Sequence, residues 1–182
     1  AGTGNPFFSV LLSISNHPPY VIPPYFHPHS DVLEEQIVEY ADWSIRQFMQ
    51  AAEKQPWFDN TIFVFLGDHG KMVGTPECEM PQSYNHIPLM IYGKDIKPGV
   101  YDGFGGQVDV SPTLLGLLNI SYLQNNFGVN LLEEERPCMF FTADNLIGAR
   151  DSVNMFIYSP DSQQEFKYKL EEGKLHAATG TD

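Results

Sequence analysis

Two apolar runs without a charged residue flank one amphipathic helical pattern, and this order constrains the fold more than any other feature of the sequence. Residues 7–15 and 61–66 are each apolar enough to form a strand that is buried on both faces of a sheet. Between them, apolar residues recur at helical spacing from Leu33 to Ala52, and Asp31 with Glu34 predicts a capping box. A strand, a helix and a second strand form a βαβ unit, which predicts a right-handed crossover and a parallel pair.

Two further elements follow along the chain. Residues 87–92 form a third apolar run and predict another strand. Ser111-Pro112 predicts the start of a short helix through Leu118, because Ser favours the N-cap and Pro the first helical position.

The C-terminal part has a different pattern. Beyond Pro137, short β-like runs alternate with turns, which predicts a small antiparallel sheet over residues 137–172. The whole pattern predicts an α/β fold, with a mostly parallel sheet flanked by helices over residues 5–120 and this sheet region after it. We expect one domain over residues 5–182, since a chain of this length can bury a sizeable core.

The acidic composition excludes one class of partner. The formal net charge is -13 and the pI is about 4.7, whereas nucleic-acid binding needs clustered Lys and Arg. The two cysteines, Cys78 and Cys138, are too few for a disulfide framework and lack zinc-site spacing. No apolar run reaches about 18 residues, so we expect no membrane span within these residues.

One polar motif lies directly after the second apolar run. Gly67-Asp68-His69-Gly70 follows residues 61–66, and ligands of open α/β sheets bind beyond the carboxyl ends of strands. Carboxylate and imidazole groups are common ligands of divalent metals. The motif by itself leaves two interpretations open: part of a metal site, or a turn with a capping Asp and an exposed His.

Four motifs in order make a family resemblance specific. They are FFSV leading to SNHPPY (residues 7–20), DNTIFVF leading to GDHG (59–70), HIPLMIY (86–92) and VDVSPTLL (108–115). Over about residues 6–120 the sequence resembles the family of lipoteichoic acid synthases and related phosphoglycerol transferases, in the sulfatase branch of the alkaline phosphatase superfamily. The resemblance implies an alkaline-phosphatase-like fold, of which this chain is the C-terminal half.

The resemblance implies a metal site. Asp68 and His69 match two ligands of the catalytic divalent ion of this family, for which we expect Mn²⁺, with Mg²⁺, Zn²⁺ and Ca²⁺ as alternatives. An imidazole ligand favours Mn²⁺ or Zn²⁺ over Ca²⁺. In two-metal members, an Asp lies four residues before the histidine that matches His17. That position is Ser13 here, so we expect a single ion.

Three other residues match substrate-facing positions. His17 is expected to hydrogen-bond the esterified phosphate or to protonate the leaving alkoxide, with a histidine that caps a loop as the alternative. His86 is either a contact to phosphate or a second metal, or a structural histidine. Lys71 either neutralises the transferred anionic group or is a solvated loop lysine. Asp109 is interpreted as a structural residue near a helix start.

The family's nucleophile is a Thr in the transferases or a Cys in Cys-x-Pro-x-Arg in the sulfatases, and it lies upstream of the matched region. Cys78-Glu79-Met80-Pro81 does not match that motif. We therefore expect this chain alone to be inactive, since no covalent intermediate can form without a nucleophile. For the intact protein the resemblance implies a metal-dependent phosphoglycerol transferase or esterase, with a sulfatase as the first alternative and a non-catalytic domain that binds an anion or glycan as the second.

The resemblance also implies partners and a location. The substrate would be an anionic phosphate or sulfate ester, in some members linked to a lipid, and the upstream half of the domain would be a structural partner. Members of this family are usually anchored in a membrane with the catalytic domain outside the cytoplasm. We expect the same extracytoplasmic location for the full-length protein.

Overall fold

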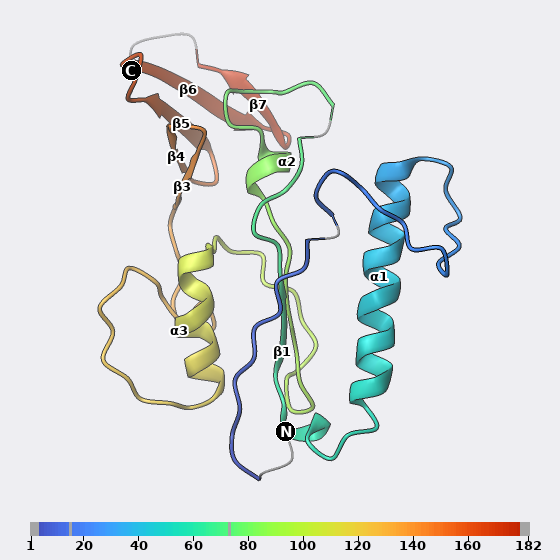
Figure 1. Ribbon diagram of the computed structural model, residues 1–182. Helices are drawn as coiled ribbons and strands as arrows, with labels where there is room; N and C mark the ends of the chain where they lie inside the picture. The colour runs from blue at the N-terminus through green and yellow to red at the C-terminus, as the bar shows by residue number, and fades with distance from the viewer. Residues whose placement is uncertain (1–3, 15, 73, 179–182) are drawn as a thin grey trace. The chain divides into compact units, whose positions relative to one another are not determined.

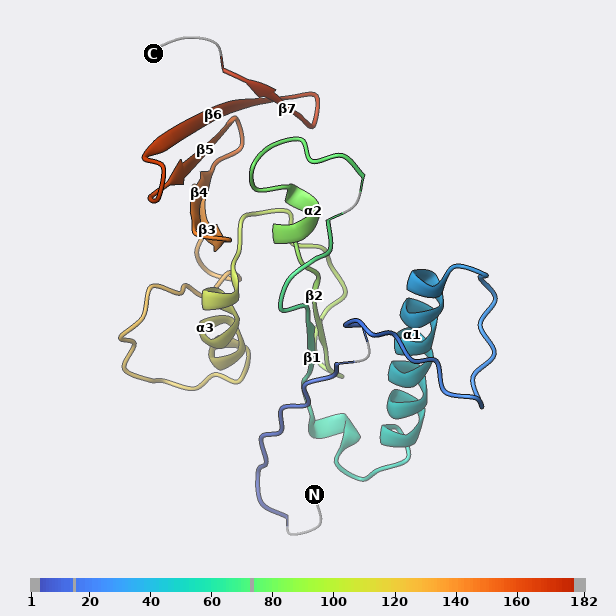
Figure 2. The same ribbon diagram turned by 45° about the horizontal axis from the view of Figure 1, so that its top comes forward.

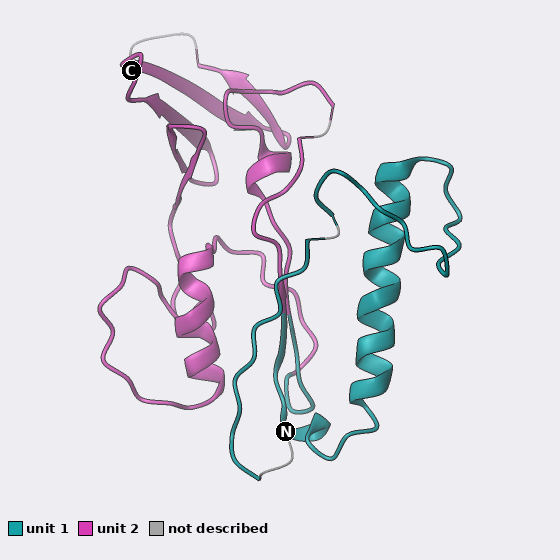
Figure 3. Cartoon of the chain, in the orientation of Figure 1, with its two compact units in different colours: residues 1–64, 91–96 teal, residues 65–90, 97–182 magenta. Residues whose placement is uncertain are grey.

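The computed structural model describes residues 4–14, 16–72 and 74–178, and the chain divides into two compact units (Figure 3). Unit 1 comprises residues 1–64 and 91–96. Unit 2 comprises residues 65–90 and 97–182.

The long helix predicted in unit 1 is confirmed as α1, Leu33–Ala52, whose inner face buries Ile37. The predicted capping box is wrong, because the N-cap is Val32 and no side chain caps it. The hydroxyl of Ser30 instead accepts the backbone N–H of Val32 at 3.0 Å. In the described part of the chain, no helix has both the length and the apolar character needed to cross a membrane.

The proline-rich segment before α1 is an irregular loop, and it packs against the helix through aromatic rings. The ring of Phe26 lies 5.3 Å from that of Tyr40 and 5.6 Å from that of Trp43, measured between centroids. The hydroxyl groups of Tyr25 and Tyr40 lie 2.9 Å apart. These contacts fix the loop on the N-terminal half of α1 (Figure 1).

The predicted strand over residues 7–15 is not formed in its described part, residues 7–14, and residue 15 lies outside the described residues. The segment is extended, and its apolar side chains are exposed: Phe8 by 88%, Leu11 by 81% and Leu12 by 83%. A strand requires hydrogen bonds to a neighbouring strand, and residues 7–14 have none. The expected parallel pair with residues 61–66 is therefore absent among the described residues.

The strands predicted over residues 61–66 and 87–92 are confirmed as the shorter β1, Phe63–Leu66, and β2, Leu89–Tyr92, which pair in a two-stranded sheet. The N–H of Gly67 donates to the carbonyl of Pro88 beyond one end. At the other end the Phe63 ring contacts that of Tyr92, with centroids 6.2 Å apart. The two strands consequently run in opposite directions.

The described part of unit 2 contains two α-helices, the short α2, Gln82–Asn85, and α3, Gln107–Leu117. The predicted helix start at Ser111-Pro112 is wrong, because α3 begins five residues earlier, with Gly106 as N-cap and Gln107 as its first residue. The carboxylate of Asp109 accepts the N–H of Gly106 at 2.8 Å. This bond starts the helix one turn before the Ser-Pro pair.

The predicted antiparallel C-terminal sheet is confirmed, and its strand order is β3-β4-β5-β6-β7 (Figures 1 and 2). The strands are β3 Met139–Ala143, β4 Leu146–Arg150, β5 Asn154–Ser159, β6 Gln164–Glu171 and β7 Lys174–Ala177. Met155 and Ile157 of β5 are buried, and they form one cluster with Cys78 and Met80 from the loop before α2. That loop is thereby part of the hydrophobic core of the sheet.

Candidate functional site

The Gly67–Gly70 turn directly follows β1 and is held by backbone contacts to two other elements of unit 2. The side-chain amide of Gln107, the first residue of α3, donates to the carbonyl of Asp68 at 2.8 Å and to that of Gly67 at 3.2 Å. The N–H of Gly70 donates to the carbonyl of Tyr84 in α2 at 2.8 Å. These bonds fix the backbone on both sides of the Asp68-His69 pair.

Gly70 lies so close to α2 that no side chain fits there. A Cβ atom at this position would lie 2.1 Å from the carbonyl oxygen of Ser83, which is backbone and cannot move aside by rotation. The turn and α2 therefore pack backbone to backbone.

Replacing Gly70 with alanine is expected to destabilise the protein by about 1–3 kcal/mol, the usual cost of overpacking. The added methyl group must push the turn away from α2 and break the bond from Gly70 to Tyr84. Gly99→Ala is the matched control, since a Cβ at Gly99 meets nothing within 4 Å. Urea denaturation of both variants measures the difference, and an equal loss in the two would contradict this packing.

Asp68 and His69 present their polar atoms to solvent next to each other. The side chain of Asp68 is 78% exposed and that of His69 is 53% exposed. Asp68 Oδ1 accepts the backbone N–H of His69 at 2.9 Å, and Asp68 Oδ2 lies 3.9 Å from His69 Nε2. His69 Nδ1 lies 2.7 Å from the carbonyl oxygen of Gly70. A carbonyl can only accept, so Nδ1 carries the proton and Nε2 is the free lone pair of the neutral ring.

This arrangement fits two ligands of one divalent ion. Histidine ligands in proteins generally donate their second ring N–H to a carbonyl or carboxylate, as His69 does to Gly70. Ligand atoms about 2.0–2.2 Å from an ion are at most about 4.4 Å apart, and the 3.9 Å between Asp68 Oδ2 and His69 Nε2 lies within that limit. Among residues 4–14, 16–72 and 74–178, no three His, Cys, Asp or Glu side chains gather as a metal-binding group. The pair could therefore supply two ligands, which is fewer than a complete metal site needs.

The other predicted site residues are placed as follows. His17 belongs to unit 1, and its Nδ1 lies 2.8 Å from the carbonyl oxygen of Pro18. Lys71 and His86 belong to unit 2 and are exposed. Lys71 follows the Gly67–Gly70 turn directly, and His86 follows α2, where its N–H donates to the carbonyl of Gln82 at 2.7 Å.

Asp109 is structural, as the sequence indicates. Its side chain is fully buried and forms a two-point ion pair with Arg136, at 2.8 Å to Nε and 2.6 Å to Nη2. Burial alone would raise the pKa of this carboxyl. The Arg136 guanidinium and the N–H groups of Val129 and Gly106 outweigh burial and lower the pKa.

Sequence reasoning missed two residues that shape the turn, Tyr84 and Gln107. The Tyr84 ring stacks on the imidazole of His69, with centroids 5.2 Å apart and planes inclined by 27°. Gln107 holds the two carbonyls of the turn from 39 and 40 positions away. No local sequence signal identifies such contacts, because both depend on how α2 and α3 pack.

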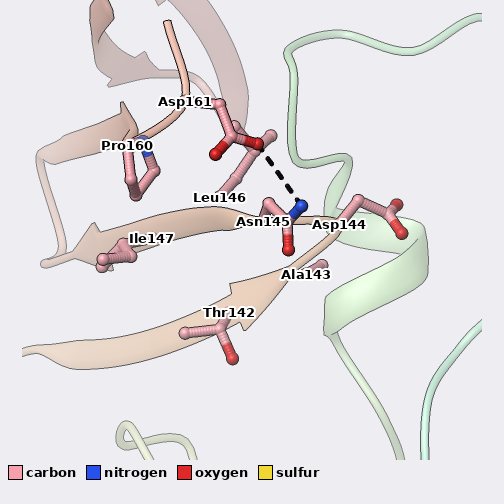
Figure 4. Close-up of a pocket in the computed structure, with 8 residues that line it drawn as sticks. All are labelled: Thr142, Ala143, Asp144, Asn145, Leu146, Ile147, Pro160 and Asp161. Atoms are coloured by element: carbon pink, nitrogen blue, oxygen red, sulfur yellow. Dashed lines mark hydrogen bonds between the residues drawn. The ribbon is translucent and has the colours of Figure 1, made fainter. Parts of the chain in front are cut away.

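A hollow elsewhere in unit 2 contains none of the predicted site residues. It lies at the turn between β3 and β4 and at the start of the turn between β5 and β6 (Figure 4). Its one hydrogen bond between lining side chains joins Asn145 Nδ2 to Asp161 Oδ2 at 3.4 Å. The ends of β3 and β4 and exposed turn residues form it, and we assign no function to it.

Comparisons with known proteins confirm the resemblance. The family profile described as Sulfatase matches residues 1–120. Lipoteichoic acid synthase 1 of Bacillus subtilis (strain 168) is 25% identical over 93% of this chain and 30% of its own length. Choline-sulfatase of Rhizobium meliloti (strain 1021) is 29% identical over 59% of this chain and 22% of its own. This chain thus spans less than a third of either relative.

A similar solved structure confirms the alkaline-phosphatase-like α/β fold. A protein in the alkaline phosphatase superfamily from Vibrio parahaemolyticus superimposes with a TM-score of 0.79 at 24% identity. The match covers 93% of this chain and 43% of the other. The α/β fold class therefore holds, although the parallel pair expected within it is absent among the described residues.

Proposed function

Because this chain belongs to the sulfatase family, we propose that it is the C-terminal half of the catalytic domain of a metal-dependent phosphoglycerol transferase. The observation that carries the proposal is the pairing of Asp68 with His69. The hydrogen bond from His69 Nδ1 to Gly70 leaves Nε2 free beside the Asp68 carboxylate. The likeness to lipoteichoic acid synthase 1 over 93% of the chain supports phosphoryl-group chemistry.

Asp68 and His69 would hold the ion, with Mn²⁺ as the expected metal because an imidazole ligand disfavours Ca²⁺. Mg²⁺ and Zn²⁺ are the alternatives. When bound, such an ion supplies Lewis-acid polarisation of a phosphoryl oxygen. Two protein ligands are fewer than the three that catalytic sites usually have. We propose that the missing ligand and the nucleophile belong to the upstream half of the domain.

His17, Lys71 and His86 would contact the anionic substrate. The Nδ1 of His17 is engaged by the Pro18 carbonyl, which leaves Nε2 for the substrate. In the imidazolium form Nε2–H can donate to a phosphate oxygen or give its proton to the leaving alkoxide. Lys71 directly follows the Gly67–Gly70 turn, His86 directly follows α2, and both side chains are exposed. Their side chains would offset the negative charge of the ester.

The upstream half would also cover the apolar segment of residues 7–14. Contiguous exposed apolar side chains usually mark an interaction surface, and Phe8, Leu11 and Leu12 are each more than 80% exposed. A strand from the upstream half that pairs with this segment would satisfy its backbone and bury these side chains. From the likeness to lipoteichoic acid synthases, we extend the proposal to an extracytoplasmic, membrane-anchored full-length protein.

A sulfatase is the second candidate, and the similarity to choline-sulfatase favours it. The test is to incubate the full-length protein with a phosphoglycerol-bearing lipid and, separately, with an aryl sulfate. We expect release of phosphoglycerol only, abolished by a chelator and restored by Mn²⁺. Hydrolysis of the aryl sulfate instead would favour the sulfatase. If neither substrate were turned over, the transferase and the sulfatase would both be contradicted. That result would support an anion-binding or glycan-binding domain without activity.

A further inference from the structure

We propose that Tyr84 is a positioning residue for His69, whose imidazole it holds by ring stacking with Nε2 directed away from the protein backbone. The inference rests on the proposed role of His69 as a metal ligand. It goes beyond that role because it assigns the orientation of the ligand to a specific residue of another element, α2.

The stacking geometry supports this role. The two rings are 5.2 Å apart between centroids and inclined by 27°, so one face of the imidazole lies against the phenol ring. The torsion that turns a histidine ring about its Cβ–Cγ bond is otherwise broad. His69 is about half exposed, and the contact with Tyr84 restricts this rotation on one side of the ring.

The backbone joins the same two residues. The N–H of Gly70 donates to the carbonyl of Tyr84 at 2.8 Å, while the carbonyl of Gly70 accepts from His69 Nδ1 at 2.7 Å. The peptide groups of Gly70 thus link the tautomer of His69 to the position of α2. A shift of α2 would disturb the stack and this pair of bonds together.

The short helix is held in place by the C-terminal sheet. A four-residue helix has no stability of its own. Its first residue, Gln82, receives a hydrogen bond from Arg150 of β4 at 2.5 Å. Met80, two residues before α2, is 1% exposed in the core formed with Met155 and Ile157. Figures 1 and 2 show α2 beside this sheet. The sheet therefore provides a rigid base for Tyr84.

The test uses Tyr84→Leu, which removes the flat ring but keeps apolar bulk, and Tyr84→Phe, which keeps the ring. In the metal-free protein at about pH 8.5, ¹⁵N shifts report the tautomer of His69. We expect protonated Nδ1 in the wild type and in Tyr84→Phe, and a mixture of tautomers in Tyr84→Leu. His69→Gln identifies the signal among the six histidines.

Calorimetric titration with Mn²⁺ gives the second measurement. Loss of a group that orients a metal ligand typically weakens affinity about 10–100-fold, which we expect for Tyr84→Leu but not for Tyr84→Phe. An unchanged tautomer and affinity in Tyr84→Leu would overturn the inference, as would equal losses in both variants. If Tyr84→Leu does not fold, nuclear Overhauser contacts between the two rings in the wild type decide, and their absence overturns it.

The two proposals fail separately. The tautomer and the ring contacts are measured without metal, so they test the positioning of His69 alone. If the wild type binds no Mn²⁺ but shows the expected tautomer and ring contacts, the metal site is refuted while the restraint on His69 by Tyr84 stands.

Discussion

Replacing Asp68 or His69 with alanine is expected to lower Mn²⁺ affinity by more than about 100-fold and to remove phosphoglycerol turnover by the full-length protein. Removing a group that only orients a metal ligand already lowers metal affinity about 10–100-fold. These variants remove a ligand itself, so a larger loss of affinity is expected. Both side chains are more than half exposed, so the free energy of unfolding should change little. Calorimetric titration and substrate turnover measure the two effects.

Matched controls separate a metal ligand from a surface charge. Asp68→Asn keeps an acceptor for the His69 N–H but loses the carboxylate charge, so it should weaken Mn²⁺ binding without altering the turn. His27→Ala removes another exposed histidine and should leave affinity unchanged. If Asp68→Ala and His69→Ala both bound Mn²⁺ with wild-type affinity, Gly67–Gly70 would be a structural turn and not part of a metal site.

Replacing Asp109 with asparagine is expected to destabilise the protein by about 3–5 kcal/mol, because the change leaves the Arg136 guanidinium without its counter-ion. The carboxylate also accepts the N–H groups of Gly106 and Val129, both at 2.8 Å. It therefore joins the start of α3 to Val129 and Arg136. Urea denaturation at about pH 7 measures the loss, and Asp102→Asn, at an exposed carboxylate, is the control.

The same pair predicts a pH dependence. The pKa of Asp109 is lowered in the folded state from its ordinary value of 3.8. A carboxyl of this kind contributes stability at pH values above its unfolded pKa and loses it as the pH falls through the folded pKa. The difference in unfolding free energy between wild type and Asp109→Asn should stay constant between about pH 5 and 8 and narrow below about pH 4. A gap that persists unchanged in acid would exclude the ionised pair as its source.

The elements with a strong local pattern could be predicted from the sequence. The periodic apolar residues of α1 and the charge-free runs of β1 and β2 require no knowledge of distant contacts, and each formed with only small changes at its ends. The C-terminal sheet was predicted over residues 137–172, whereas β7, Lys174–Ala177, extends beyond that range. Gly148 within β4, Leu146–Arg150, weakens the strand pattern there.

Residues 7–14 show the limit of such patterns. Their composition is that of a buried strand, but a strand forms only when another strand supplies hydrogen bonds and a covering layer. The described residues provide neither to this segment. The same applies to α3, whose start is set by the bond from Gly106 to Asp109 and by the Arg136 pair, rather than by the Ser-Pro signal.

For the candidate site, the types of side chain could be predicted from the sequence, whereas their geometry depends on tertiary packing. The order of the four motifs identified the family, and Asp68-His69 placed a carboxylate and an imidazole after a strand. Each of these features is a run of neighbouring residues, so it can be recognised without knowledge of distant contacts. Only the packing of α2 and α3 on the turn decided that Gln107 fixes its carbonyls, that Gly70 admits no side chain, and that Tyr84 stacks on His69. Those contacts join residues 13 or more positions apart, and their formation depends on the hydrophobic core that fixes both elements.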